Sequence, residues 1–391
     1  MTPKPATTSG APLALDCRYF AAGTCRSCTW LDTPRDAQVA RKVARAAQAV
    51  DADAWLEPVV GPAGAFRNKA KMVVGGTVDH PTLGILSPQA QGVDLQDCPL
   101  YPAAMRPVFA ALAQFITLAR LEPYDVTARK GELKSVLVTA SPTGEFMVRW
   151  VLRSTEALAR IAKHLPWLQA QIPTLAVASV NILPQHMAVL EGPEETVLTA
   201  RQALPMRVND VTVELRPQSF FQTNTDVAAQ LYAQVTRWLA PLEPRDVWDL
   251  YCGVGGFALH LVAPGREVVG VEASEQAIAA ARDTVRQWVD EGRPGADHAR
   301  FVAQDATAFA LAATHPPDAV IVNPPRRGIG PELADWVQRS GVPTVVYSSC
   351  NVDTLQADLA RMSAYRVVEA RVLDMFPHTA HMEVAVLLRR A

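Results

Sequence analysis

The sequence contains no apolar run that approaches the roughly 20 residues of a membrane-spanning helix, so no such span is expected. It also has little net charge: 37 Lys and Arg stand against 39 Asp and Glu, a formal −2. This balance neither indicates nor excludes a nucleic-acid partner, because local patches decide such binding. The opening MTPKPATTSGAPLAL has one lysine and a short apolar patch, so we expect a disordered leader on a cytoplasmic protein and no signal peptide.

Cysteine is scarce as well, with six in 391 residues, and a disulfide framework is not expected in a chain of this size. Cys17, Cys25 and Cys28 lie close together, and Cys98 follows alone. Four thiols without a histidine suit zinc or an iron–sulfur cluster. Zinc ribbons usually use two paired CxxC knuckles, whereas here three thiols share one loop. The spacing therefore favours a cubane cluster and leaves zinc as the alternative.

The hydrophobic patterning changes near residue 215. Residues 35–50 predict a helix, and 66–215 contain alternating strand patterns interrupted by a helix at 154–171. After Arg216, strands alternate with helices, which is typical of a doubly wound parallel sheet, and 365–390 predict a terminal antiparallel hairpin. We therefore expect three parts: 1–60 with the leader, cysteine loop and first helix; 61–215, a strand-rich α+β domain; and 216–391, an α/β domain.

A glycine-rich loop, DLYCGVGG at 249–256, follows an apolar strand and precedes a helix. Gly253 and Gly255 let the backbone turn tightly and approach a ligand. The next two strands end in Glu272, suited to the hydroxyls of a ribose, and Asp305, suited to an adenine edge. NAD and S-adenosylmethionine both fit, and the GxGG spacing favours the methyl donor. The alternative role for both acids is helix capping.

Two further strand ends carry residues suited to methyl transfer at a pyrimidine carbon. After Asn323-Pro324-Pro325 the chain has Arg326, where enzymes that methylate exocyclic amino groups carry an aromatic residue. In VVYSSCN, a Cys350 thiolate could add to carbon 6 of a pyrimidine and make carbon 5 nucleophilic. Removal of the carbon 5 proton then needs a base, and Glu383 at the head of an apolar strand is the candidate. An inert buried cysteine and a surface glutamate are the alternatives.

Aromatic and basic side chains indicate RNA contacts. Phe220 and Phe221 are neighbours, so one should face the core and the other could stack on a base. Basic residues alternate on one predicted strand and open another, so they could track phosphates. These basic residues include Arg67, Lys69, Arg129 and Lys130. A solvated strand face is the alternative for each patch.

Six segments in chain order resemble the RNA uracil-5-methyltransferase family: FRNKAKMVV, RPQSFFQTN, DLYCGVGGF, NPPRRGIG, YSSCN and HTAHMEV. The resemblance runs from about residue 17 to the end and implies a Rossmann-like methyltransferase domain that uses S-adenosylmethionine. It implies Cys350 as nucleophile and Glu383 as base. The implied donor contacts are Gln222, Tyr251, Glu272, Asp305 and Asn323, and the implied [4Fe-4S] ligands are Cys17, Cys25, Cys28 and Cys98. Several relatives carry aspartate at the position of Asn323.

The cluster cysteines separate this chain from the tRNA enzymes of the family. One 23S rRNA branch has an extra β-barrel domain before the cluster, and the sixteen residues ahead of Cys17 are too few for one. The remaining 23S rRNA branch is the nearest resemblance, and it implies methylation of one uridine carbon 5, with no membrane or protein partner implied. The alternatives are cytosine C5 methylation, another rRNA or tRNA uracil, and an inactive iron–sulfur RNA-binding protein.

Overall fold

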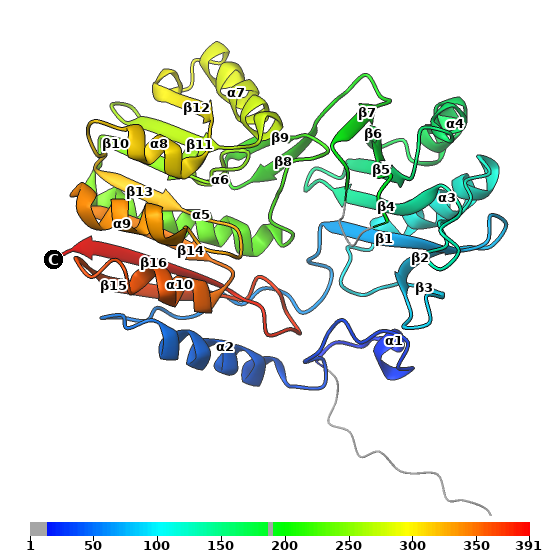
Figure 1. The fold of residues 1–391 in the computed structure, drawn as a ribbon, viewed down its shortest axis with the longest axis horizontal. Helices are drawn as coiled ribbons and strands as arrows, with labels where there is room; N and C mark the ends of the chain where they lie inside the picture. Colours follow the sequence, from blue (N-terminus) through cyan, green and yellow to red (C-terminus); the bar gives the residue numbers. More distant parts are fainter. Residues whose placement is uncertain (1–13, 187–190) are drawn as a thin grey trace, which may run out of the picture.

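The computed structural model describes residues 14–186 and 191–391, which form two large sheets and a small hairpin (Figure 1). The predicted leader falls largely on residues 1–13, outside the described residues. Within the described ranges, no helix has both the length and the apolar character that a bilayer crossing requires.

The first sheet has the strand order β3-β2-β1-β4-β5-β6-β7. Its strands are β1 (Lys69–Gly76), β2 (Pro81–Leu86), β3 (Gly92–Asp94), β4 (Leu133–Ala140), β5 (Phe146–Leu152), β6 (Leu175–Ile182) and β7 (Glu194–Val197). Helices α3 (Met105–Leu118) and α4 (Leu158–Gln171) share one apolar core with this sheet. Sequence analysis predicted α4 and overlooked α3, although buried residues at 105, 108, 109, 112 and 116 have helical spacing.

The second sheet has the order β12-β11-β10-β13-β14-β16-β15. Its strands are β10 (Asp246–Leu250), β11 (Glu267–Glu272), β12 (Ala299–Ala303), β13 (Ala319–Val322), β14 (Thr344–Ser349), β15 (Tyr365–Leu373) and β16 (Glu383–Arg390). Strands β10 to β14 pair in parallel, whereas β16 pairs antiparallel with both β14 and β15. The predicted α/β class is confirmed, with a Rossmann-like fold.

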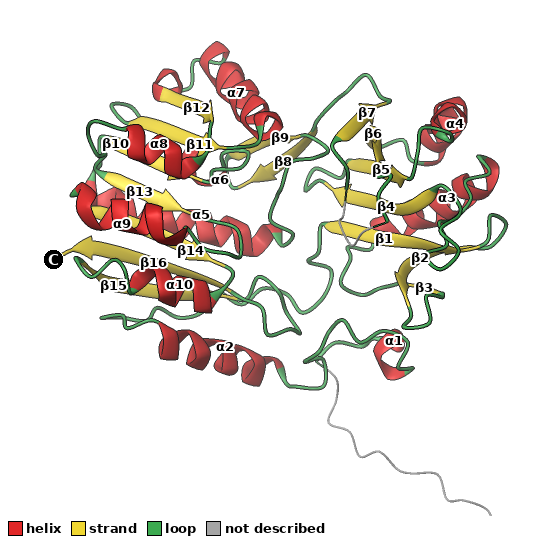
Figure 2. Ribbon diagram, in the orientation of Figure 1, coloured by secondary structure: helices red, strands yellow, loops and turns green. Residues whose placement is uncertain are grey.

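Helices cover both faces of the second sheet (Figure 2). On one face lie α5 (Thr225–Leu239), α6 (Gly256–His260) and α7 (Glu275–Asp290); on the other lie α8 (Ala306–Ala312), α9 (Gly330–Ser340), α10 (Val352–Leu359) and α2 (Arg35–Ala49). Alternate strand residues supply the two cores, as Val247 and Trp248 illustrate. This double burial explains the continuous apolar runs of these strands.

The N-terminal part joins both sheets. A short helix, α1 (Arg18–Ala21), lies near the first sheet, whereas residues 52–59 run parallel to β15 and so extend the edge of the second sheet. The hairpin of β8 (Leu204–Val208) and β9 (Val211–Leu215) shares a core with α5 and α7. Short 3-10 turns occur at Ala240–Leu242 and Ala296–His298. The carboxyl ends of the parallel strands point toward the first sheet (Figure 1).

Candidate active site at the carboxyl edge of the second sheet

The glycine loop joins β10 to α6 at the carboxyl edge of the sheet. Gly255 has a φ of +87°, and a Cβ there would lie 2.9 Å from the Phe301 ring, so this position requires glycine. Gly253 also has a positive φ, as does Tyr251, whose φ of 66° is uncommon for a side chain of that size. These positive φ angles turn the loop tightly between β10 and α6, and a Cβ at Gly253 would meet no atom within 4 Å, so the space beside this glycine is open.

Carboxylates surround this loop. Glu272, at the end of β11, accepts hydrogen bonds from the backbone N–H of Gly253 at 3.4 Å and of Ser274 at 3.0 Å. Asp305 follows β12 and accepts a bond from the N–H of Ala308 at 2.9 Å, so it caps α8. Capping was the alternative role considered for both acids, and for Asp305 it is present. Partial burial raises the pKa of the Tyr251 hydroxyl, and the Asp305 charge acts in the same direction.

One acidic residue that sequence analysis did not assign lies under the loop. Asp249 is fully buried in β10, and its Oδ2 accepts a bond from the N–H of Ala258 at 2.9 Å. Within the described part of the chain, its Oδ1 has no hydrogen-bond partner. Burial raises the pKa of Asp249 to about 7. A carboxylate four residues before Gly253, at the start of the DLYCGVGG segment, was the available signal.

Gln222 is another residue predicted to contact the methyl donor, and it lies on the segment between β9 and α5. Its side chain is almost buried, and its backbone carbonyl accepts a bond from Asn68 Nδ2 at 2.9 Å. Asn68 also donates to Thr225 Oγ1 at 2.8 Å. These bonds tie the residue before β1 of the first sheet to the segment that leads into α5, beside Gln222.

The proposed nucleophile and base lie on paired strands. In the antiparallel register of β14 and β16, Ser349 pairs with Val384, so Cys350, one residue on, falls opposite Glu383. Side chains of Ser348, Cys350 and Glu383 point to the same face, because strand side chains alternate. Cys350 is half-buried, and burial followed by the nearby Glu383 charge raises the pKa of its thiol. Arg326 acts in the opposite direction.

Glu383 is buried, with 2% of its surface exposed. Its Oε1 accepts bonds from Ser348 Oγ at 2.5 Å and from Asn323 Nδ2 at 2.9 Å. Burial raises the pKa of Glu383 to about 7, and the two hydrogen bonds limit the rise. The structure thus places Asn323, which was predicted to contact the methyl donor, against the candidate base.

The chain is similar in sequence to known methyltransferases. The family model described as tRNA (Uracil-5-)-methyltransferase matches residues 199–391. A 23S rRNA (uracil(747)-C(5))-methyltransferase from Yersinia pestis (strain Pestoides F) is 48% identical over 378 residues, which cover 96% of this chain and 99% of that protein. A protein of the same name from Yersinia pseudotuberculosis serotype I (strain IP32953) matches equally.

The chain belongs to the RNA uracil-5-methyltransferase family. Among solved structures, the Pyrococcus abyssi tRNA (uracil-54, C5)-methyltransferase in complex with S-adenosyl-L-homocysteine has a TM-score of 0.75 and 24% identity. The match covers 92% of this chain and 85% of that one, and it supports the fold.

The two adjacent phenylalanines have separate environments. Phe220 is 66% exposed, whereas Phe221 is 6% exposed and belongs to the core around α5. Phe220 is therefore the ring that remains available for stacking. The two side chains differ in how far each is buried, and the sequence did not show which of the two would be exposed.

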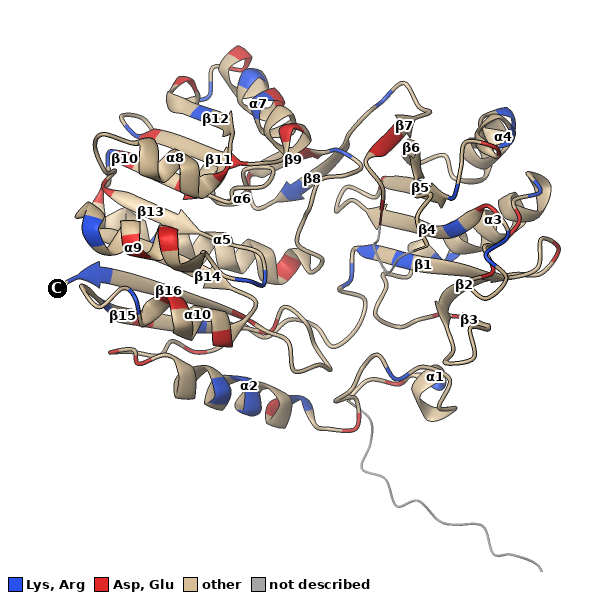
Figure 3. Cartoon of the chain, in the orientation of Figure 1, with Lys and Arg blue, Asp and Glu red and all other residues tan. Residues whose placement is uncertain are grey.

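The basic side chains do not form one track. Lys69 and Lys71 occupy alternate, half-exposed positions of β1, and Figure 3 marks basic residues on this strand. Arg67 lies before β1 and lines the cavity of the four N-terminal cysteines. Arg129 and Lys130 are exposed in the turn before β4. Lys69 pairs with Thr139, six residues beyond the start of β4, so this turn is roughly 20 Å away along the strand.

The four N-terminal cysteines line one cavity of about 210 Å³. Apolar and aromatic side chains complete most of its wall: Leu15, Tyr19, Phe20, Leu31, Ile85, Leu95, Leu100 and Tyr101. Burial raises the pKa of Cys28 to about 12 and that of Cys98 to about 11. In residues 14–186 and 191–391, no three Cys, His, Asp or Glu side chains converge closely enough for a single metal ion.

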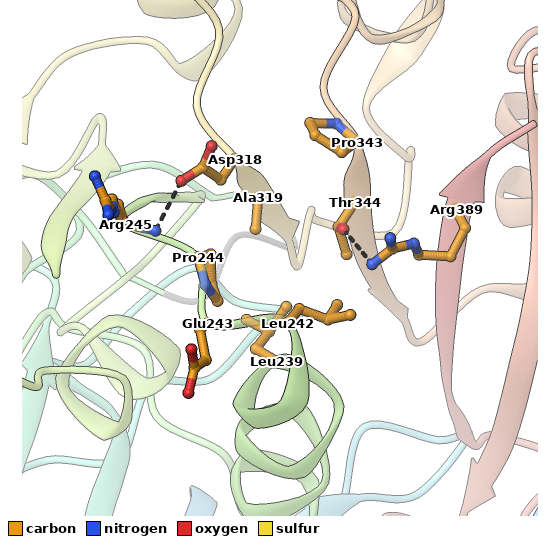
Figure 4. Close-up of a pocket in the computed structure, with 10 residues that line it drawn as sticks. All are labelled: Leu239, Leu242, Glu243, Pro244, Arg245, Asp318, Ala319, Pro343, Thr344 and Arg389. Carbon is orange, nitrogen blue, oxygen red and sulfur yellow. Dashed lines mark hydrogen bonds between the residues drawn. The ribbon is translucent and has the colours of Figure 1, made fainter.

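A second hollow, of about 340 Å³, lies at the opposite edge of the sheet (Figure 4). It is lined by residues at the amino ends of β10, β13 and β14, and Arg389 donates to Thr344 Oγ1 across it at 3.0 Å. Ligands of open α/β sheets bind at the carboxyl ends of the strands. This hollow is therefore separate from the candidate active site.

Proposed function

We propose that this protein transfers a methyl group from S-adenosylmethionine to carbon 5 of uracil 747 in 23S rRNA. The observation that carries the chemistry is the strand register that faces Cys350 toward Glu383 beside the glycine loop. The target nucleotide follows from the names of the two Yersinia relatives. An rRNA substrate implies that the reaction takes place in the cytoplasm.

The methyl donor supplies an electrophilic methyl group on a sulfonium. We assign its binding to residues around the glycine loop: Gln222, Tyr251, Gly253, Gly255, Glu272, Asp305 and Asn323. The open space beside Gly253, where a Cβ would meet no atom within 4 Å, and the carboxylate of Glu272 support a ligand that brings hydroxyl groups close to the main chain. Asp249 supports the loop from below through its bond to Ala258.

Cys350 and Glu383 divide the chemistry between them. Carbon 5 of uracil is too weak a nucleophile to attack the methyl group directly. Addition of the Cys350 thiolate to carbon 6 forms a sulfur–carbon bond and turns the ring into an enolate, so carbon 5 becomes nucleophilic. After methyl transfer and departure of S-adenosylhomocysteine, Glu383 takes the carbon 5 proton. Elimination of the thiolate then restores the ring double bond.

The uracil must leave its stack to reach Cys350, so the substrate is a loop or an opened helix. Phe220, as the exposed ring before α5, would stack on a base. Lys69 on β1, with Arg67 beside it, would contact phosphates, and the distant Arg129 and Lys130 would contact a separate part of the RNA. An extended substrate is consistent with this spread of contacts.

A trapping experiment tests the covalent scheme. Glu383→Gln enzyme, incubated with a 23S rRNA fragment and S-adenosylmethionine, should accumulate a protein–RNA adduct that survives denaturing electrophoresis, because proton removal is blocked. The matched Cys350→Ala variant should form no adduct. Methylation by Cys350→Ala at the wild-type rate would contradict the scheme.

The identity of the product tests the substrate. Mass spectrometry of nucleosides from treated RNA should show 5-methyluridine, and 5-methylcytidine would favour the cytosine alternative. RNA from a strain that lacks this protein should miss one 5-methyluridine at position 747. RNA binding without any methyl transfer would favour an inactive binding protein.

We also propose that Cys17, Cys25, Cys28 and Cys98 hold a [4Fe-4S] cluster. Their cavity has room for a multi-atom group, and its burial opposes free thiolates, so iron would supply the positive charge that keeps four thiolates together. The methylation scheme needs no electrons, which leaves the cluster a structural or RNA-positioning role. Anaerobically purified protein should be brown, with about four iron and four sulfide per chain. Colourless protein with stoichiometric zinc would contradict this assignment, and Cys98→Ser should lose the colour.

A further inference from the structure

The Glu383 carboxylate is held by donors from two other strand ends. Ser348 comes from β14 and is fully buried, and Asn323 follows β13. Their bonds of 2.5 and 2.9 Å both end on Oε1 of Glu383. Among the described residues, the hydrogen bonds to this carboxylate all use Oε1, so Oε2 is the oxygen left to receive a proton.

The amide nitrogen of Asn323 donates both of its hydrogens within this arrangement. Its Nδ2 carries two hydrogens, one donated to Glu383 Oε1 and the other to the carbonyl of Ser348 at 3.1 Å. A contact between Asn323 and the methyl donor can therefore use only its Oδ1 as an acceptor. An ionised aspartate here could donate neither bond and would bring a second negative charge to Glu383.

The neighbouring titratable groups do not replace these donors. Cys350 faces Glu383 from the same side of β14, and Tyr232 approaches from α5. Arg326 acts on the Cys350 thiol, and its Nη2 lies 3.3 Å from Nδ1 of His381, two residues before Glu383. The direct hydrogen bonds to the base thus come from the neutral groups of Ser348 and Asn323 alone in the described chain.

We propose that Ser348 and Asn323 are positioning residues for the base: they orient the Glu383 carboxylate beside Cys350, keep it ionised and direct Oε2 toward the carbon 5 proton. This inference rests on the proposed function. Neither residue contacts the reacting atoms in this role, and both act through Glu383. Ser348 lies on the same strand face as Cys350, so one strand supplies the nucleophile and one support of the base.

The test is to measure the pH dependence of adduct formation and of adduct resolution separately. In single-turnover reactions with 23S rRNA fragment, Ser348→Ala should shift the midpoint for resolution of the adduct upward by about 1 pH unit, because one hydrogen bond to a charged group is lost. The adduct should accumulate at neutral pH, since its formation does not need the base. Ser349→Ala is the matched control: its hydroxyl bonds Asn351 on the other strand face, so the midpoint should stay unchanged.

A second variant covers a failure of Ser348→Ala to fold. Asn323→Asp keeps the shape but removes the donor, so it should shift the midpoint in the same direction. Suppose that Glu383→Gln traps an adduct but that the folded Ser348 and Asn323 variants have the midpoint and adduct lifetime of wild type. This result would overturn the inference. If Glu383→Gln traps none, the proposed function fails first.

Discussion

The Glu383→Gln substitution should change how the stability of the protein depends on pH. Glu383 is 2% exposed, and burial raises its pKa from an ordinary value of 4.5 to about 7. A folded-state pKa above the unfolded value stabilises the protein fully below pH 4.5, and this contribution is lost as the pH rises through about 7. The difference, about 7 minus 4.5, corresponds to roughly 3 kcal/mol over the whole window.

Of this loss of stability, about 2 kcal/mol is expected between pH 5.5 and pH 8.0. Glutamine has nearly the same shape, can accept both bonds to Oε1 and does not titrate. The variant should therefore gain about 2 kcal/mol relative to wild type when the pH is raised from 5.5 to 8.0. Asp249, whose pKa is also about 7, titrates in both proteins and cancels in the comparison.

The assay is urea unfolding followed by tryptophan fluorescence, with wild type and variant measured side by side at both pH values. Asp249→Asn removes another buried acid of the same sheet and serves as the comparison variant. A stability difference between wild type and Glu383→Gln that is the same at both pH values would refute the reasoning. Glu383 would then not be the buried acid that the structure describes.

Two further predictions concern packing and RNA contact. Lys42→Met should cost about 3 kcal/mol of unfolding free energy in urea titrations, because Lys42 and Asp374 are 2.5 Å apart with side chains 0% and 1% exposed, and the change leaves a buried charge with fewer partners. A loss below about 0.5 kcal/mol would contradict this. Phe220→Ala should weaken RNA binding by about 1–3 kcal/mol in filter-binding assays and leave stability unchanged. Phe221→Ala should instead destabilise the protein by about 3 kcal/mol, and equal effects of the two would contradict the assigned environments.

Local patterns were sufficient for most of the fold. Strand–helix alternation after residue 216 predicted the second sheet and its terminal hairpin, because buried parallel strands have continuous apolar runs. The same reasoning missed α3. This helix is nearly all apolar, so its buried residues do not stand out from the rest at helical spacing. The position of a thiol at the end of one predicted strand and of a carboxylate at the head of another likewise singled out Cys350 and Glu383 as candidates.

Alternation also shows from sequence that Ser348 and Cys350 share a strand face, but it does not show what lies opposite them. The partner of Ser348 is 35 residues away and that of Asn323 is 60 residues away, and both depend on β16 entering the sheet beside β14. A shift of one residue in that register would turn Glu383 to the other face. The sequence by itself determined the chemical groups and the strand ends that carry them. Only the tertiary structure decided which groups meet, because strand order and register arise from packing between distant segments.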